Sequence, residues 1–246
     1  MKRKLFVVSD VHGHTTELKR ALAKAGFDSE NKDHVFVSCG DLFDRGEENA
    51  QLYEFVKGLK RKILIKGNHE AILYEVLIGG KMIEEANLNG TDQTIAQIFG
   101  EDAVDENGNF DKISKKAETD EMIAFLDSMP NYYETEQYVL THGWLPVVFE
   151  GYYPQIDPFW RNVTEKDWKD VRWFEWQQFY SAKAMLEGKT IVCGHRPARL
   201  GHMFDDWREP GSDETFYGDG LVAIDTDTIK SGFVNVFVME ETKGEI

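Results

Sequence analysis

The sequence has few cysteines, a shortage of basic residues and no long hydrophobic run, and each shortage excludes a class of protein. Its two cysteines, Cys39 and Cys193, each close an apolar run and precede a glycine, which favours small buried side chains over a disulfide. Basic residues number 28 against 44 acidic ones, and the formal net charge is −16. Such a surface repels nucleic acid and anionic membranes, so we expect neither among the partners of this chain.

No apolar segment approaches the length of a membrane-spanning helix, which is about 20 residues. The first apolar run, Leu5 to Val8, is broken by Ser9 and Asp10 before the apolar core of a signal peptide can form. The sequence therefore predicts a cytoplasmic protein, and it leaves the oligomeric state unknown.

The chain does hold enough apolar material for a large core, since 41% of its 246 residues are hydrophobic and 13% are aromatic. This length is compatible with one α/β domain over residues 1–246. Helical spacing with polar breaks predicts a helical cap over residues 71–129, inserted within that domain. Near the end, residues 221–225 and 232–239 alternate like antiparallel strands, and we expect them to complete a second sheet.

A charged segment bounded by two glycines, Gly40-Asp41-Leu42-Phe43-Asp44-Arg45-Gly46, follows the apolar run Val35-Phe36-Val37. Glycine at both ends lets the backbone turn sharply and approach a ligand closely. A single carboxylate such as that of Asp41 can coordinate two cations, one through each oxygen. Taken alone, the segment is equally consistent with a solvated turn that holds an ion pair.

Two neighbouring apolar runs end in polar residues of the same kind. Asp10 and His12 follow residues 4–9, and their spacing of two places both side chains on one side of an extended segment, within reach of one cation. Asn68 and His69 follow the short run Ile63 to Ile65. Because open α/β sheets bind ligands at the carboxyl ends of their strands, three such clusters in succession indicate a functional site.

These three motifs, Asp-x-His, Gly-Asp-x-x-Asp-Arg-Gly and Gly-Asn-His-Glu, resemble those of the calcineurin-like metallophosphoesterase superfamily. Within it the chain is similar to the phosphoprotein phosphatase branch, which includes phage-type bacterial Ser/Thr phosphatases and symmetrical bis(5'-nucleosyl)-tetraphosphatases. The fourth and fifth motifs of that family have counterparts in His142 and His195, each of which follows an apolar run and adjoins a glycine. The resemblance implies an α/β fold (an α+β sandwich) in which two mixed β-sheets pack face to face between flanking helices.

Carried over residue by residue, the resemblance implies a centre with two divalent transition metal ions. Asp41 bridges the two cations, Asp10 and His12 complete one site, and the amide of Asn68 joins the other. The six implied ligands are Asp10, His12, Asp41, Asn68, His142 and His195. Such a mixed nitrogen and oxygen set suits manganese, iron, zinc, nickel or cobalt, and we expect manganese.

The same resemblance assigns roles in the reaction. A hydroxide that bridges the metals attacks phosphorus directly, without a covalent phosphoenzyme. His69 protonates the leaving oxygen while Asp44 orients its ring, and Arg45 stabilises charge on the phosphate oxygens. The family has a second phosphate-binding arginine, usually close to a tryptophan; the candidates are Arg172 and Arg161, and we favour Arg172.

The substrate is the point on which the sequence leaves alternatives open. The phage-type resemblance favours phosphoserine and phosphothreonine in proteins, or another small phosphoester. The alternative is cleavage of diadenosine tetraphosphate to two ADP, in which Arg196 and Arg199 could hold a second phosphate or simply pair with acids. An aromatic segment, residues 152–176, either forms a wall for a nucleobase or a peptide side chain or anchors a long loop. A decayed metal-binding scaffold is the remote alternative.

Overall fold

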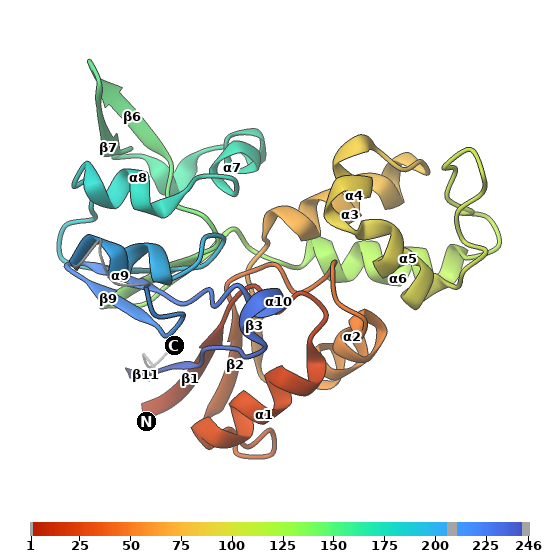
Figure 1. Cartoon of the computed structure of the whole chain (residues 1–246), viewed down its shortest axis with the longest axis horizontal. Coiled ribbons are helices and arrows are strands. Elements are labelled where there is room, and N and C mark those ends of the chain that lie inside the picture. The colour runs from red at the N-terminus through yellow and green to blue at the C-terminus, as the bar shows by residue number, and fades with distance from the viewer. Residues whose placement is uncertain (1, 206–210, 243–246) are drawn as a thin grey trace.

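The computed structural model describes residues 2–205 and 211–242, and its strands form two mixed β-sheets and a separate hairpin (Figure 1). In the first sheet, β1, β2 and β3 are parallel, while β11 is antiparallel to β1. In sheet order these strands are β11 (Phe237–Thr242), β1 (Lys2–Val8), β2 (His34–Ser38) and β3 (Lys62–Leu64).

The second sheet has three parallel central strands and one antiparallel strand at each edge. In sheet order its strands are β4 (Tyr132–Glu134), β5 (Tyr138–Thr141), β8 (Thr190–Cys193), β10 (Leu221–Ala223) and β9 (Phe216–Gly218). The hairpin consists of β6 (Val147–Glu150) and β7 (Tyr153–Ile156) and projects at the upper left of Figure 1.

The two sheets pack face to face because their strands alternate apolar side chains between an inner and an outer face. In β1, Leu5 and Val7 point inward, whereas Phe6 and Val8 point toward the helices. The inner layer draws on both sheets; its buried members are Leu5, Val7, Val35, Val37, Cys39, Ile65, Leu140, Val192, Val222, Ile224 and Met239. The predicted fold class is therefore confirmed.

Helices cover the outer face of each sheet. On the first sheet lie α1 (Thr15–Ala25) and α2 (Asn49–Gly58), and α1 turns the buried side chains of Leu18 and Leu22 toward the core. On the second sheet lie η1 (Trp160–Asn162), α7 (Glu165–Val171), α8 (Trp176–Ser181) and α9 (Arg199–Asp205). A short helix near the end of the chain, α10 (Thr228–Ser231), carries Lys230, which lines the same pocket as Asp10 and Asp41.

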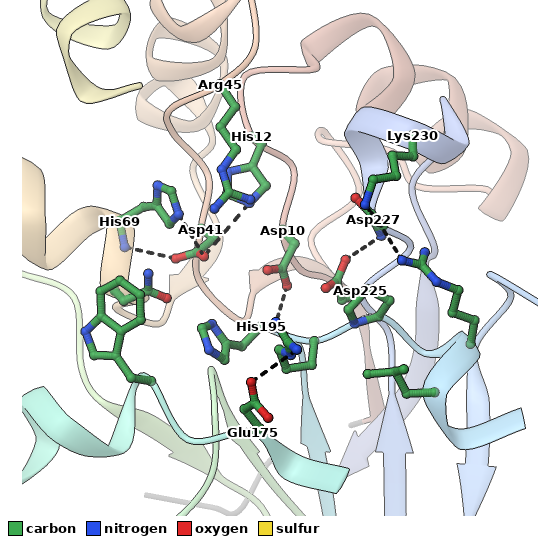
Figure 2. A pocket seen from close by; sticks show the side chains of 16 residues that line it. Asp10, His12, Asp41, Arg45, His69, Glu175, His195, Asp225, Asp227 and Lys230 are labelled. Atoms are coloured by element: carbon green, nitrogen blue, oxygen red, sulfur yellow. Dashed lines mark hydrogen bonds and ion pairs between the residues drawn. The ribbon is translucent and has the colours of Figure 1, made fainter. Parts of the chain in front are cut away.

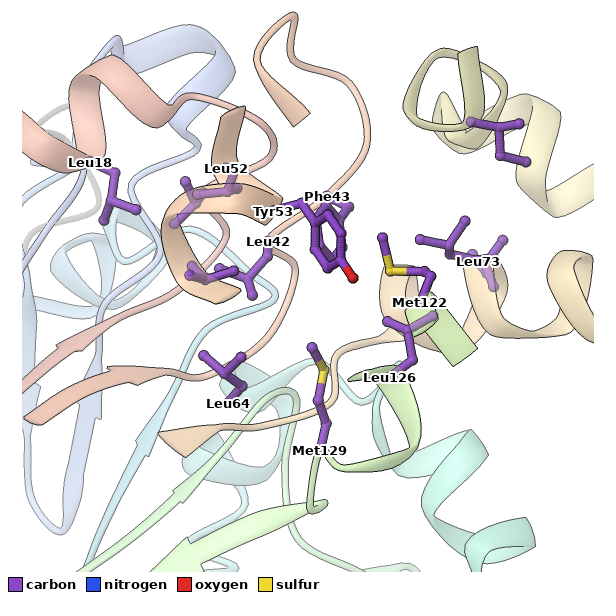
Figure 3. Close-up of a cluster of buried hydrophobic side chains, with 14 of the residues drawn as sticks. Leu18, Leu42, Phe43, Leu52, Tyr53, Leu64, Leu73, Met122, Leu126 and Met129 are labelled. Atoms are coloured by element: carbon purple, nitrogen blue, oxygen red, sulfur yellow. The ribbon is translucent and has the colours of Figure 1, made fainter. Parts of the chain in front are cut away.

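Four helices lie beside the first sheet in the region where the sequence predicts a cap: α3 (Asn68–Gly79), α4 (Glu84–Asn89), α5 (Thr91–Phe99) and α6 (Lys116–Asp127). Their apolar side chains do not form a core of their own. Leu73 and Met122 of the cap belong to the same buried cluster as Leu42, Phe43 and Tyr53, which follow or cover the first sheet (Figure 3). The cap is thus packed onto the elements that carry the second motif.

The aromatic segment serves mainly as an anchor. Trp160, Trp168 and Trp176 are buried in the cluster that covers the outer face of the second sheet. Trp173 differs, because 42% of it is exposed and it lines a cavity near the strand ends. The three buried rings therefore support the interpretation of this segment as an anchor, and a ligand wall at Trp173 stays a prediction.

Residues 232–239 do not complete the second sheet, in contrast to the prediction. β11 begins at Phe237 and pairs with β1, placing Met239 opposite Leu5 in the first sheet. β10 does join the second sheet, but it is parallel to β8 and antiparallel only to β9. Alternation shows that a segment is a strand and does not select its partner, because pairing depends on contacts distant in sequence.

Both cysteines are buried and unpaired, as expected. Among the residues that the structure describes, every helix is too short or too polar to span a bilayer.

The shared core leads us to propose that residues 1–246 unfold as one unit, with 71–129 as an insertion. Leu73→Ala should lower the free energy of unfolding by about 2–5 kcal/mol, because Leu73 is fully buried between cap and sheet. Leu88→Ala is the matched control, since Leu88 is 78% exposed. All tryptophans follow residue 143, so tryptophan fluorescence reports the second half of the chain. If urea unfolding of Leu73→Ala shifts the far-UV circular dichroism transition without shifting the fluorescence transition, the cap unfolds separately.

Candidate metal centre

The polar motifs converge because each follows the carboxyl end of a strand on the same side of the sandwich. Asp10, Asp41 and Asn68 follow the parallel strands β1, β2 and β3, while His142 and His195 follow the parallel strands β5 and β8. Parallel strands that are neighbours place their carboxyl ends at one edge. Figure 2 shows the resulting cluster at the floor of a pocket.

Asp41 lies at the middle of this cluster, and three imidazoles approach its carboxylate. Its Oδ2 lies 3.3 Å from Nε2 of His142, 3.7 Å from Nε2 of His69 and 3.9 Å from Nε2 of His12. The donor atoms of His12, Asp41 and His69 all lie within 4.8 Å of one another, and so do those of Asp41, His142 and His195. Asp41 therefore belongs to two clusters at once, which is the arrangement a bridging ligand requires.

Two of the imidazoles are held by backbone carbonyls on the side away from Asp41. Nδ1 of His12 lies 2.9 Å from the carbonyl oxygen of Phe43, and Nδ1 of His142 lies 2.9 Å from that of Cys39. Each Nδ1 donates its proton there, so Nε2 is directed at the centre. Such contacts fix the orientation of histidine ligands and raise their basicity.

The remaining predicted ligands complete the ring of donors. Oδ1 of Asn68 lies 2.8 Å from Nε2 of His142, and Oδ2 of Asp10 accepts hydrogen bonds from the backbone N–H of His195 at 2.9 Å and the hydroxyl of Ser9 at 2.5 Å. All six predicted ligands thus lie together around Asp41.

Burial and mutual charge determine the protonation of this cluster. Burial raises the pKa of Asp10 to about 6 and lowers the pKa of His195 to about 3. Burial also lowers the pKa of His142, but the carboxylate of Asp41 outweighs that effect and raises it to about 9. Burial acts to raise the pKa of Asp41, yet His142 and His69 hold it well below its usual value. Deprotonated Asp41 and neutral His195 are the forms that bind cations.

The backbone around the centre is strained at seven residues other than glycine, all of which have a positive φ. Such conformations cost about 1–3 kcal/mol each, and they persist only where surrounding structure enforces them. The seven residues are Asp10, His12, Asp41, Asp44, Arg45, His195 and Asp227. Gly67 is needed for a different reason: a Cβ at this position would lie 2.1 Å from Oδ1 of Asp41, so a side chain does not fit there. The surrounding structure therefore enforces strained backbone conformations, and these direct the side chains inward.

This donor set fits two divalent cations. The donors are carboxylate, amide and imidazole atoms, they are almost entirely buried, and one carboxylate is shared between two clusters.

His69 lies near the centre but has a different partner. Its Nδ1 lies 2.7 Å from Oδ2 of Asp44, and that carboxylate also accepts hydrogen bonds from Thr91 at 2.8 Å and Thr94 at 2.7 Å. Burial lowers the pKa of His69, but Asp41 and Asp44 outweigh it, so the net pKa is raised. The predicted His69–Asp44 pair is therefore formed, with Nε2 facing Asp41.

Arg45 lies at the rim, on the His12 side of the centre. Its Nη1 is 3.3 Å from Nε2 of His12, and its Nη2 donates to Oδ1 of Asn89 at 3.4 Å. The other predicted arginines lie elsewhere. Arg161 forms an ion pair with Glu134 on the surface and lines a different cavity.

Arg172 does not reach this pocket, which corrects the preference for it as a phosphate ligand. It is buried, its guanidinium donates to Asn131 and Glu165, and it lines a separate cavity beside Lys66. The next residue, Trp173, does line the pocket. The side chains of Arg172 and Trp173, which follow α7, enter different cavities. Being next to Trp173 in the sequence therefore does not place Arg172 at the site.

Sequence reasoning also missed Glu70, which is fully buried beneath the centre. Its two oxygens accept hydrogen bonds from the backbone N–H groups of Asp41 at 2.9 Å, Leu42 at 2.8 Å and Gly67 at 2.8 Å. The side chain therefore ties the second motif to the third. The position of Glu70 directly after Asn68 and His69 was a signal that it belongs to the site. The sequence around it does not indicate that it accepts hydrogen bonds from three backbone N–H groups.

The pocket above the centre has a volume of about 500 Å³ and extends away from Asp41. On the side that sequence reasoning largely missed, it is lined by Trp173, Glu175, Arg196, Arg199, Asp225, Asp227 and Lys230. Burial raises the pKa of Asp225 well above its usual range, an effect that neighbouring Asp10 reinforces. This wall carries both signs of charge.

Glu70→Gln should weaken binding of Mn²⁺ by about 10- to 100-fold, the usual effect of losing a group that orients metal ligands. Glutamine offers one oxygen and one NH₂ group to three backbone N–H donors, so the loop that carries Asp41 loses its support. Glu54→Gln is the control, since the Glu54 side chain is 71% exposed. Isothermal titration calorimetry measures both; equal affinities would show that Glu70 does not position the ligands.

Comparison with known proteins assigns the chain to a family. A family model for calcineurin-like phosphoesterases matches residues 3–223. The asymmetrical bis(5'-nucleosyl)-tetraphosphatase PrpE of Bacillus subtilis (strain 168) is 25% identical over 209 residues, which cover 78% of this chain and 79% of the relative. The symmetrical bis(5'-nucleosyl)-tetraphosphatase of Coxiella burnetii (strain Dugway 5J108-111) is 26% identical over 247 residues, covering 86% and 75%.

Among solved structures, a protein serine/threonine phosphatase from Saccharomyces cerevisiae, with similarity to human phosphatase PP5, matches with a TM-score of 0.53 at 15% identity. The match covers 99% of this chain and 81% of that one, and it supports the fold. The family model spans far more than half of the sequence, so this chain belongs to the calcineurin-like phosphoesterase family and is a metal-dependent phosphoric ester hydrolase.

Proposed function

We propose that this chain hydrolyses phosphoric esters with two divalent cations held by Asp10, His12, Asp41, Asn68, His142 and His195. The observation that carries the proposal is the position of Asp41, whose carboxylate belongs to two donor clusters. Two cations bound there supply positive charge for phosphate oxygens and lower the pKa of a water molecule to near neutrality. The donor set suits manganese, iron, zinc, nickel or cobalt, and manganese is our choice for the experiments.

His69 is the proposed general acid. Its Nδ1–H donates to Asp44, which leaves Nε2 facing the pocket floor. The raised pKa of His69, which Asp41 and Asp44 cause against the effect of burial, favours the imidazolium form, and an imidazolium can give the Nε2 proton to a leaving oxygen. Asp44 is held by Thr91 and Thr94, so it keeps the ring in one orientation.

Arg45 is the proposed ligand for phosphate oxygens on the His12 side. Its guanidinium lies at the rim of the pocket, and within residues 2–205 and 211–242 its hydrogen-bond contacts are long, at 3.3 Å to His12 and 3.4 Å to Asn89. It is therefore free to form shorter, charge-assisted hydrogen bonds with a substrate. Those bonds stabilise the charge that develops on the oxygens during transfer.

Dinucleoside tetraphosphates are the substrate class that we place first. Two curated relatives that cover most of this chain carry the name bis(5'-nucleosyl)-tetraphosphatase. The pocket extends from the candidate metal centre past the half-exposed ring of Trp173 to the positively charged side chains of Arg196, Arg199 and Lys230. It therefore provides room and contacts for more than one phosphoryl group. Phosphoserine and phosphothreonine in proteins, which the sequence favours, are the second candidate, since the centre itself requires only one phosphoryl group.

A decayed scaffold is the least supported alternative. The donor clusters that His12, His142 and His195 form with Asp41 support a working site, and so does the contact between His69 and Asp44. A protein that only binds partners has no use for a buried proton donor aimed at the same point.

Asp41→Asn and His69→Asn separate metal binding from proton transfer. We expect Asp41→Asn to lose Mn²⁺ together with hydrolysis of p-nitrophenyl phosphate, because its neutral amide can no longer bridge two cations. His69→Asn should retain both metals and lose about 10²–10⁴-fold in kcat when the leaving group is an alcohol that needs a proton. Elemental analysis and steady-state kinetics measure the two effects.

The control for these variants is His34→Asn, which changes a histidine outside the pocket. Equal metal loss in Asp41→Asn and His69→Asn would make His69 a ligand and overturn its role as the acid. Full activity of metal-free wild-type protein would overturn the two-metal proposal itself.

Substrate preference is tested with one Mn²⁺-loaded preparation assayed on diadenosine tetraphosphate and on a phosphothreonine peptide. We expect kcat/KM to favour the dinucleotide by at least about tenfold, which corresponds to 1.4 kcal/mol of transition-state stabilisation. Products identify the bond that is cleaved, since symmetrical cleavage gives two ADP and asymmetrical cleavage gives ATP and AMP. A tenfold preference for the peptide would establish the protein phosphatase instead.

A further inference from the structure

Among the residues that the structure describes, four lysine and arginine side chains line the pocket, and they differ in how many of their N–H donors are already hydrogen-bonded. Arg199 donates to Asp213 at 3.0 Å and to Asp227 at 2.8 Å, and Lys230 donates to the same Asp227 at 2.8 Å. Arg199 and Lys230 are thus held in an ion-pair network with carboxylates of the pocket wall. Their N–H donors are already hydrogen-bonded within the protein.

Arg196 is in a different state. Within the described part of the chain its guanidinium has one ionic contact, from Nη2 to Oε1 of Glu175 at 3.1 Å. Its Nε is buried and has no hydrogen-bond partner among those residues. A buried N–H without a partner requires an explanation, and a ligand in the adjoining pocket would supply one by engaging the guanidinium.

The protein holds Arg196 in place from two directions. Its backbone carbonyl accepts a hydrogen bond from Nε1 of buried Trp176 at 2.8 Å. Oε2 of Glu175 accepts from Gln177 at 3.0 Å and Gln178 at 2.9 Å, which leaves Oε1 for Arg196. A surface arginine paired only for solubility needs no such support, so this arrangement resembles a positioned binding group.

Arg196 also lies on the opposite side of the centre from Arg45. Figure 2 shows Arg45 beside His12, and Glu175, the partner of Arg196, beyond His195. Arg196 directly follows His195 in the chain, and both residues line the pocket. An anion that reaches Arg196 while a phosphoryl group occupies the centre must therefore extend past His195, away from Arg45.

We propose that Arg196 binds a second phosphoryl group of the substrate, adjacent to the one that is hydrolysed, and thereby selects polyphosphate esters over monoesters. The guanidinium is a planar fork that matches phosphate oxygens. Arg196, rather than Arg172, is then the second arginine of this site, and Glu175 is its positioning residue. This inference rests on the proposed two-metal hydrolysis and names the feature of the substrate that the pocket recognises beyond the reacting group.

The test compares kcat/KM for diadenosine tetraphosphate with that for p-nitrophenyl phosphate, which has a single phosphoryl group. Arg196→Gln should lower kcat/KM for the dinucleotide by about 10- to 100-fold, the usual effect of losing a charge-assisted hydrogen bond. The loss on p-nitrophenyl phosphate should be at least tenfold smaller. Arg161→Gln is the matched control, because Arg161 is ion-paired to Glu134 and lines a different cavity.

Equal losses on both substrates would mean that Arg196 contacts the reacting phosphoryl group. No loss on either substrate would mean that Arg196 contacts no phosphoryl group. Each result overturns the inference and leaves the two-metal proposal intact. Wild-type protein without metal-dependent hydrolysis of either substrate would instead overturn the proposed function.

Binding provides a readout that does not require turnover. In the His69→Asn background with Mn²⁺, ADP should bind at least tenfold more tightly than AMP by calorimetry, and adding Arg196→Gln should remove that difference. Equal affinities for ADP and AMP before the arginine is changed would refute the inference.

Glu175→Gln tests the positioning role. If Glu175 acts only through Arg196, its effect on the ADP-to-AMP affinity ratio should disappear when Arg196→Gln is already present. An undiminished effect in the double variant would show that Glu175 acts independently of the arginine.

Discussion

The carboxylate of Asp41, buried among three imidazoles, is the constraint on which the rest of this structure depends. An ionised carboxylate without partners is expensive to remove from water, so the protein must surround it with positive charge or with hydrogen-bond donors. His142 and His69 supply part of that compensation at 3.3 Å and 3.7 Å. The strand ends that carry these residues therefore have to meet at one point, and two sheets packed face to face allow them to do so.

Holding this point requires structure well outside the ring of ligands. Glu70 binds three backbone N–H groups of the loops that carry Asp41 and Asn68, and the cap supplies Thr91 and Thr94, which fix Asp44. The cap also shares its apolar core with the second motif. Strained backbone around the centre is thus stabilised by packing and by hydrogen bonds of side chains that do not themselves line the pocket, such as Glu70, Thr91 and Thr94, as expected for a preorganised site.

The fold was predictable wherever the signal is local. The strands alternate apolar side chains because both their faces are buried, and in α1 the buried Leu18 and Leu22 lie one helical turn apart on the same face. The location of the last strand was not predictable: residues 232–239 read as part of the second sheet, yet β11 pairs with β1 at the other end of the chain. A strand pattern specifies an extended segment with two faces, whereas its partner is decided by long-range packing.

The sequence by itself indicated which polar side chains meet at one point, because each stands directly after an apolar run or within a motif that follows a strand; their proposed roles as metal ligands and proton donor come from the family resemblance. The arginine that we propose for a second anion was indicated only by the tertiary structure. Arg172 lies beside Trp173 in the sequence but turns into another cavity, and Arg196 faces the pocket because Glu175 and Trp176, about twenty residues earlier, hold it there. The direction of a long, flexible side chain depends on the partners that folding brings to it, and those partners are not local in sequence.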